Sequence, residues 1–127
     1  MSNALWILGH VIVDRKMLGN ILGMDEEITQ RDRLFEAGTK PDDVPEDVAG
    51  EEVLAEYQAF HERFVTHLQG LSDEDLNHPT EAQFPMTPQT RIGAVQFLLM
   101  HEGYHVGQLG ALHVMMGKGA WFKKLQG

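Results

Sequence analysis

The chain has 127 residues, a net charge of −9 at neutral pH and no cysteine. This length predicts one domain, residues 1–127, with a modest core. The acidic charge argues against nucleic acid or an anionic membrane as a partner, since binding phosphates needs a basic surface. The lack of cysteine excludes disulfides and thiolate metal ligands. No apolar run reaches the roughly 18 residues of a membrane span and no signal-peptide pattern is present, so we expect a cytoplasmic protein.

The first part of the chain predicts two helices and a connection. Asn3 is a candidate N-cap for a helix that runs to about Leu22, where Gly23 offers a left-handed stop. A charged stretch over residues 25–37 predicts a second helix. Residues 38–50, with two prolines and several acidic side chains, predict a solvated connection.

The second part predicts two long helices separated by a long loop. Apolar residues recur with a 3.6-residue period over residues 51–69, which favours a helix. Ser72 begins a capping arrangement for one short turn, and residues 77–88 predict irregular structure because they contain three prolines. Thr87 as N-cap, with a proline after it, predicts a last helix that ends at Met116.

These elements predict an all-α helical bundle. No stretch alternates apolar and polar residues as a strand would, and no internal repeat is present. Only three long helices are visible, one fewer than a four-helix bundle needs. The closing segment Trp121–Leu125 is apolar and basic, and is a candidate for docking on the bundle or on a partner chain.

The pair His101 and His105 is the strongest chemical signal in the sequence. Residues four apart share one face of a helix, with side chains about 6 Å apart, so both imidazoles can bind one cation. The plainer interpretation is that both histidines are either hydrogen-bonded within the core or exposed at the surface. However, the surrounding helix is apolar, and burying two unpartnered imidazoles costs free energy that a metal ion removes. A third ligand must come from another helix, and His10 is the only histidine in the predicted first helix.

A zinc peptidase is a less favoured interpretation of the same residues. His101-Glu102-x-x-His105 matches the motif in which two histidines hold zinc and the glutamate acts as general base. The third histidine of metzincins would follow six residues after the second, whereas His113 follows eight residues after it. No strands are predicted to hold a peptide. Glu102 lies about 100° around the helix from His101, which predicts a solvated carboxylate or one behind the ligands.

Two segments together resemble the DinB superfamily of helical bundles. They are Asn3-Ala-Leu-Trp6-Ile-Leu-Gly-His10 and His101-Glu-Gly-Tyr104-His105-Val-Gly-Gln108-Leu109. The resemblance implies an up-down-down-up four-helix bundle and a metal triad of His10, His101 and His105 that holds zinc or nickel. It also implies a homodimer. The family's first helix is expected to be missing here, and a partner subunit is a candidate to supply it.

The resemblance also implies an activity, because the superfamily includes transferases and isomerases that use low-molecular-weight thiols. We therefore expect a metal-dependent transferase of the thiol-dependent S-transferase type, or a hydrolase, acting on a small-molecule substrate. A three-histidine site keeps the charge of the cation and leaves coordination positions open, which suits either chemistry. A non-catalytic bundle protein that binds a metal or a ligand is the alternative from a different class.

Four further residues lie within about one helical turn of the candidate ligands. Trp6 and Tyr104 are expected to wall a pocket or to fill the core. Gln108 is a candidate to reach a metal-bound water or to bond between helices. Asp14, four residues after His10, is a candidate to orient that imidazole from behind.

Overall fold

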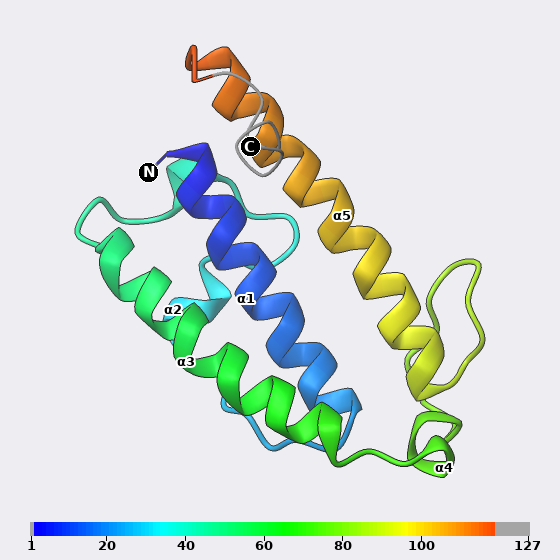
Figure 1. Ribbon diagram of the computed structural model, residues 1–127. Helices are drawn as coiled ribbons and strands as arrows, with labels where there is room; N and C mark the ends of the chain where they lie inside the picture. The colour runs from blue at the N-terminus through cyan, green and yellow to red at the C-terminus, as the bar shows by residue number, and fades with distance from the viewer. Residues whose placement is uncertain (1, 119–127) are drawn as a thin grey trace.

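Three long helices make up most of the computed structural model, which describes residues 2–118 (Figure 1). The elements are α1 (Asn3–Ile21), α2 (Gln30–Arg33), η1 (Pro41–Asp43), α3 (Gly50–Gln69), α4 (Asp73–Leu76) and α5 (Arg91–Met115). Within residues 2–118 the only strand-like pairing is one isolated bridge, between Pro79 and Thr90. The predicted all-α fold is therefore confirmed. The segment Trp121–Leu125, proposed to dock, lies outside the described residues.

The first two predicted helices differ from the observed ones at their ends. Ser2, not Asn3, caps α1, and its side chain accepts a hydrogen bond from the backbone N–H of Leu5. The helix expected over residues 25–37 is only the single turn of α2. Thr29 caps that turn, and after it the chain bends so that Phe35 is buried in the core. Burial of one aromatic side chain thus outweighs continued helix in a highly charged segment.

The last helix begins three residues later than the sequence predicted. Thr90, not Thr87, is the N-cap of α5, and its hydroxyl accepts a hydrogen bond from the N–H of Gly93. A Cβ built on Gly93 would lie 1.8 Å from the carbonyl oxygen of Pro88. Glycine at this position therefore lets the loop fold back across the first turn of the helix, which leaves Pro88 outside it.

α1 lies between the other two long helices and packs against both (Figure 1). Because it is covered on two sides, it contributes buried residues to two apolar clusters. One cluster comprises Ile12, Val13, Phe35, Val44 and Val53. The other comprises Leu18, Leu22, Phe60, Phe64 and Ala94, and reaches α5. These contacts hold α1 and α5 side by side, the arrangement that the candidate site requires.

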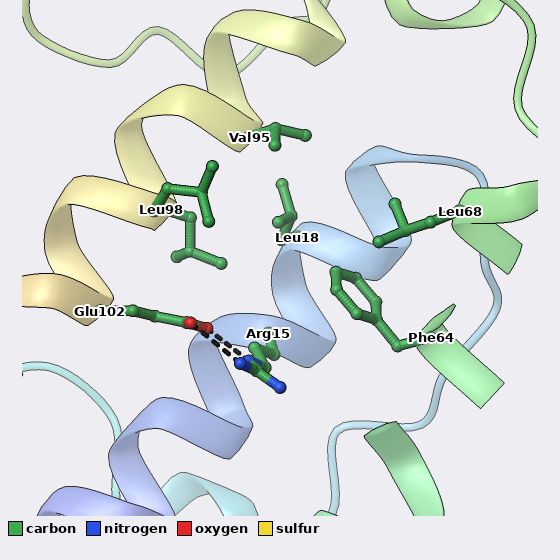
Figure 2. Close-up of a pocket in the computed structure, with 8 residues that line it drawn as sticks. Arg15, Leu18, Phe64, Leu68, Val95, Leu98 and Glu102 are labelled. Atoms are coloured by element: carbon green, nitrogen blue, oxygen red, sulfur yellow. Dashed lines mark hydrogen bonds and ion pairs between the residues drawn. The ribbon is translucent and has the colours of Figure 1, made fainter. Parts of the chain in front are cut away.

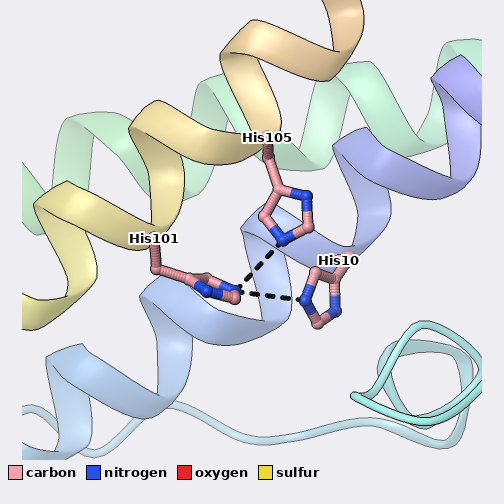
Figure 3. Close-up of side chains that lie close together, drawn as sticks. All are labelled: His10, His101 and His105. Carbon is pink, nitrogen blue, oxygen red and sulfur yellow. Dashed lines mark hydrogen bonds between the residues drawn. The ribbon is translucent and has the colours of Figure 1, made fainter. Parts of the chain in front are cut away.

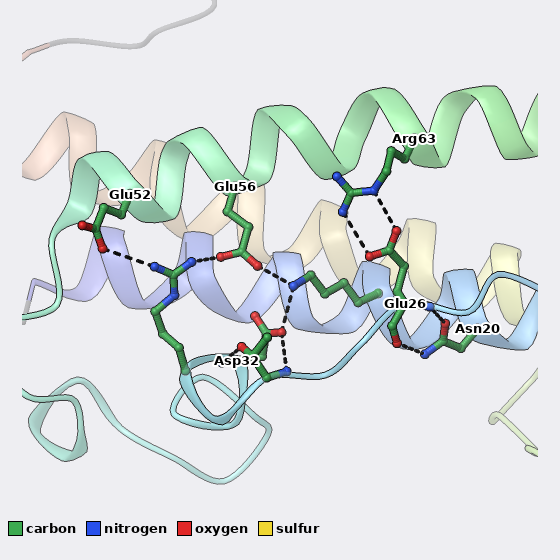
Figure 4. A network of polar contacts seen from close by, with 9 residues as sticks. Asn20, Glu26, Asp32, Glu52, Glu56 and Arg63 are labelled. Carbon is green, nitrogen blue, oxygen red and sulfur yellow. Dashed lines mark hydrogen bonds and ion pairs between the residues drawn. The ribbon is translucent and has the colours of Figure 1, made fainter.

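A buried charged network joins α1, α2 and α3 (Figure 4). Lys16 on α1 is only 3% exposed, and its ammonium donates to Asp32 Oδ2 at 2.8 Å and to Glu56. Asp32 also accepts a hydrogen bond from the backbone N–H of Thr29, so the same carboxylate caps α2. Arg31 pairs with Glu56 from the other side. The network fixes the segment after α1 against α3.

None of the helices within residues 2–118 combines the length and the apolar character that crossing a bilayer requires.

Candidate metal centre

Three imidazoles, His10 from α1 and His101 and His105 from α5, meet at the seam between those helices (Figure 3). Nε2 of His101 lies 3.4 Å from Nε2 of His10 and 3.1 Å from Nε2 of His105. The three ligand nitrogens all lie within 4.8 Å of one another. The structure thus brings together residues that are 91 positions apart in the sequence.

The spacing of these nitrogens fits a tetrahedral zinc site. Zinc binds histidine nitrogen at about 2.0–2.1 Å, so two ligands of a tetrahedron lie about 3.3 Å apart. The separations of His101 Nε2 from Nε2 of His105 and of His10, 3.1 Å and 3.4 Å, are close to that edge. Three nitrogens from three imidazoles are also a donor set that zinc and nickel accept. The residues present therefore fit a divalent cation, with at least one coordination position left for another molecule.

The position of His10 is fixed from behind by two contacts. Its Nδ1 lies 2.7 Å from the carbonyl oxygen of Phe35, and the indole of Trp6 stacks on its ring at 5.0 Å, nearly parallel. Because a carbonyl oxygen only accepts, Nδ1 carries the proton in the neutral ring. Nε2 therefore keeps its lone pair directed at the cluster, which is the tautomer a metal needs.

His105 is held in the same way by residues of its own helix. Its Nδ1 donates to Gln108 Oε1 at 2.7 Å, and the Gln108 amide in turn donates to the hydroxyl of Tyr104 at 3.3 Å. Gln108 thus supports a candidate ligand from behind rather than reaching the centre itself. Burial lowers the pKa of His105, because an imidazolium is poorly solvated there. The neutral form that binds a cation is therefore favoured.

His101 is the ligand on the open side of the cluster. Its side chain is 31% exposed, whereas His10 and His105 are buried. Its ring stacks on Phe97, one turn earlier on α5, with 6.0 Å between the ring centroids. A molecule that enters the site would therefore approach past His101.

Asp14 lies on the metal side of the histidines rather than behind them. Its Oδ2 is 3.2 Å from Nε2 of His10 and 2.9 Å from Nε2 of His101. The contact with His10 that the sequence suggested is present, but it is made at the atom that faces the cluster. The nitrogen of His10 that faces away from the cluster, Nδ1, instead donates to the carbonyl oxygen of Phe35. The carboxylate therefore adds a negative charge beside three converging ring nitrogens, an arrangement that favours a bound cation.

Glu102, the residue a peptidase would use as its base, is bound by Arg15 instead. Nε and Nη2 of Arg15 donate to its two carboxylate oxygens at 2.5 Å and 3.0 Å. The same hydrogen bonds raise the pKa of Arg15 above its usual value. Figure 2 shows this pair at the edge of a cavity of about 100 Å³ between α1, α3 and α5. Glu102 is therefore neither solvated nor directed at the histidines, and the peptidase interpretation has no structural support.

Sequence reasoning missed two residues that shape the site. Phe35 acts through its backbone carbonyl, which no side-chain pattern reveals. Phe97 lies four residues before His101 on α5, so helical spacing did carry a signal for it. An aromatic side chain on an apolar helix is usually part of the core, so this spacing did not by itself indicate a role at the site.

Fold and site together define a class of protein, an all-α bundle with a candidate three-histidine metal centre between two of its helices. The family model of the DinB superfamily matches residues 1–109. The chain belongs to this superfamily, as its two histidine-containing segments predicted. Neither a curated protein nor a solved structure matches the chain.

Proposed function

We propose that this protein binds one divalent cation, zinc or nickel, through His10, His101 and His105, and uses it in a transferase or hydrolase reaction on a small molecule. The observation that carries the proposal is the convergence of three imidazole nitrogens within 4.8 Å of one another, two of them in rings whose Nδ1 is already engaged. In a thiol-dependent transferase, a low-molecular-weight thiol would be the second reactant.

The cation would supply a Lewis acid that lowers the pKa of a coordinated water or thiol, so that a nucleophile exists near neutral pH. The protein's own part is to orient the ligands and to manage a proton. Phe35 and Gln108 hold two imidazoles in the required tautomer. Oδ2 of Asp14, which faces the cluster, is placed to accept a proton from a nucleophile held there.

Metal content tests the ligand set. We expect about one zinc or nickel per wild-type chain by elemental analysis, and loss of that metal in His10→Ala. His78→Ala is the matched control because His78 is exposed in the loop before α5 and lies outside the cluster. Metal retained in His10→Ala, or none in the wild type after purification in zinc-supplemented buffer, would refute the triad.

An Asp14→Asn variant separates catalysis from simple metal binding. The amide is nearly the same size as the carboxylate but cannot take up the proton. If the protein is an enzyme, we expect turnover to fall by about 10²-fold or more while the metal content stays near one per chain. A non-catalytic metal- or ligand-binding protein is the alternative. It predicts that both variant and wild type bind metal and that neither turns over thiol acceptors or esters.

We further propose that the protein forms a homodimer, in which a partner subunit covers the cavity of about 100 Å³ between α1, α3 and α5. Several large apolar side chains of α5 are exposed, Leu99 by 65% and Val106 by 47%. Leu99 also lines the cavity of about 100 Å³ between α1, α3 and α5, beside which a fourth helix of a bundle would pack. Light scattering of the wild type and of Leu99→Glu tests this. A dimer that becomes a monomer in the variant supports it, and a monomeric wild type refutes it.

A further inference from the structure

A second cavity, of about 380 Å³, begins at the open side of the histidine cluster. His10, Asp14 and His101 form one part of its lining. Its volume lies in the range of sites for small molecules, about 300–1,000 Å³. It differs from the smaller cavity of Figure 2, which shares Leu18 and Leu98 with it but extends toward Phe64 and Leu68 of α3.

The rest of the cavity follows the seam between α1 and α5. On α1, Met17 and Ile21 continue the face of Asp14, and on α5, Phe97 and Ala94 precede His101. Residue numbers rise along one wall and fall along the other, because the two helices are antiparallel here. From His10 to Ile21 the α1 wall is about 16 Å long at 1.5 Å per residue. The cavity is thus an elongated trough with the candidate metal at one end.

Aromatic rings form a continuous row along this trough. Phe84, from the loop before α5, stacks on Phe97 with 4.8 Å between centroids, and Phe97 stacks on His101. The loop therefore does more than connect α4 to α5, because it closes one wall of the cavity. Flat apolar surfaces of this kind favour aliphatic or aromatic groups over hydrated ones.

The charge of the lining restricts what can bind. Asp14 is the only carboxylate among the described residues that line the cavity, and none of them is lysine or arginine. The nearest arginine on α1, Arg15, is engaged by Glu102 at the other side of the helix. A substrate with a carboxylate or phosphate on its far end would find no counter-charge in an apolar trough, and burial there would cost free energy.

We propose that this trough binds the uncharged apolar body of the substrate, aliphatic or aromatic, and places a polar reacting group at the histidine cluster. The inference rests on the proposed metal site and adds the substrate class. Met17, Ile21, Phe84 and Phe97 contact the apolar body, and Asp14 and His101 lie beside the reacting group.

A series of alkyl hydroxamates tests the proposal, because the hydroxamate group binds zinc while the alkyl chain varies. Zinc content is measured first, and the zinc-loaded protein is then titrated calorimetrically with acetohydroxamate, butanohydroxamate, hexanohydroxamate and octanohydroxamate. We expect affinity to rise roughly fourfold per added methylene. A hexanohydroxamate with a terminal carboxylate should lose most of the affinity that plain hexanohydroxamate gains over acetohydroxamate.

Two variants locate the binding site. Ala37 lines the trough but is exposed to solvent, so Ala37→Phe should fill part of the trough without disturbing the core. We expect it to weaken octanohydroxamate binding about tenfold and to leave acetohydroxamate unchanged. Ala59→Phe, on the exposed side of α3, is the matched control and should change neither.

The outcomes distinguish the two proposals. Zinc binding with no dependence on chain length, or an Ala37→Phe variant that binds octanohydroxamate like the wild type, overturns the trough and leaves the metal centre intact. No zinc in the wild type overturns the proposed function, and this inference fails with it.

Discussion

Lys16 is the clearest case of a single residue on which the structure depends. Its ammonium is buried between Asp32 and Glu56, which come from two other elements. Buried charges of this kind are stable only as a set, because removing one member leaves the others desolvated and unpaired. The sequence offered no sign of this role, since a lone lysine on a helix is ordinarily exposed.

Replacing Lys16 tests that dependence. We expect Lys16→Met to lower the free energy of unfolding by about 3 kcal/mol, because the buried Asp32 carboxylate then loses its counter-charge. Urea denaturation followed by circular dichroism measures the loss. The double variant Lys16→Met, Asp32→Asn should recover part of it, and an unchanged midpoint in the single variant would contradict the argument.

Glu26 provides a pH-dependent contribution. Arg63 donates two hydrogen bonds to its carboxylate, at 2.8 Å and 3.0 Å, and these lower the pKa of Glu26 below its usual 4.5. A carboxylate with a lowered folded-state pKa stabilises the fold above its unfolded-state value. That stability is lost as pH falls through the folded-state pKa. Since Arg63 is half exposed, the contribution is about 1 kcal/mol or less.

Urea denaturation across a pH series tests this. At about pH 7 we expect Glu26→Gln to have a free energy of unfolding lower than that of the wild type by about 1 kcal/mol or less. The difference should shrink as the pH falls through the lowered pKa of Glu26, where the wild-type carboxyl becomes protonated as well. Glu27→Gln, at an exposed neighbour, is the matched control. A difference that does not vary with pH would mean that the ion pair contributes nothing.

At the scale of elements, Gly9 connects the packing of α1 to the candidate site. A Cβ at this position would lie 2.3 Å from the ring of Phe35. The glycine therefore lets Phe35 pack directly on the helix, and the carbonyl of that same residue accepts the hydrogen bond from His10. One small residue thus determines both a core contact and the orientation of a ligand on the next position of the helix.

Gly9→Ala should therefore affect both properties. We expect its zinc affinity to fall about tenfold or more, because losing the hydrogen bond that orients a metal-binding histidine typically has an effect of this size. The unfolding midpoint should also fall. Competition with a coloured chelator measures the affinity. Gly107→Ala is the matched control, because nothing lies within 4 Å of a Cβ there and alanine is the better helix former. Equal affinities for both variants would refute the link.

The elements also show what could be predicted from the sequence. The three long helices follow from apolar periodicity and glycine stops, and the His101–His105 pair follows from helical spacing alone. The short α2 and the late start of α5 could not be predicted, because Phe35 and Gly93 take up positions set by distant parts of the chain. The support of His10 by a backbone carbonyl has no sequence pattern at all.

At the scale of the whole molecule, the candidate centre joins the first long helix to the last. A ligand that binds only the folded chain raises its free energy of unfolding by RT ln(1 + [L]/Kd). Zinc at about 100 times its Kd should therefore raise the free energy of unfolding by about 2.7 kcal/mol. Urea denaturation with zinc and after chelation measures this shift. His101→Ala should show no shift, and a wild type that ignores zinc would contradict the proposed site.

The separation of the candidate ligands along the chain also determines when, during synthesis, the site can first form. His101 is added to the growing chain 91 residues after His10. At about 5–20 residues per second, that interval is roughly 5 to 18 seconds of synthesis. During that time His10 has no partner histidine from α5, so the ribosome-bound chain lacks the complete site. The cation proposed here would be acquired only after synthesis has passed residue 105.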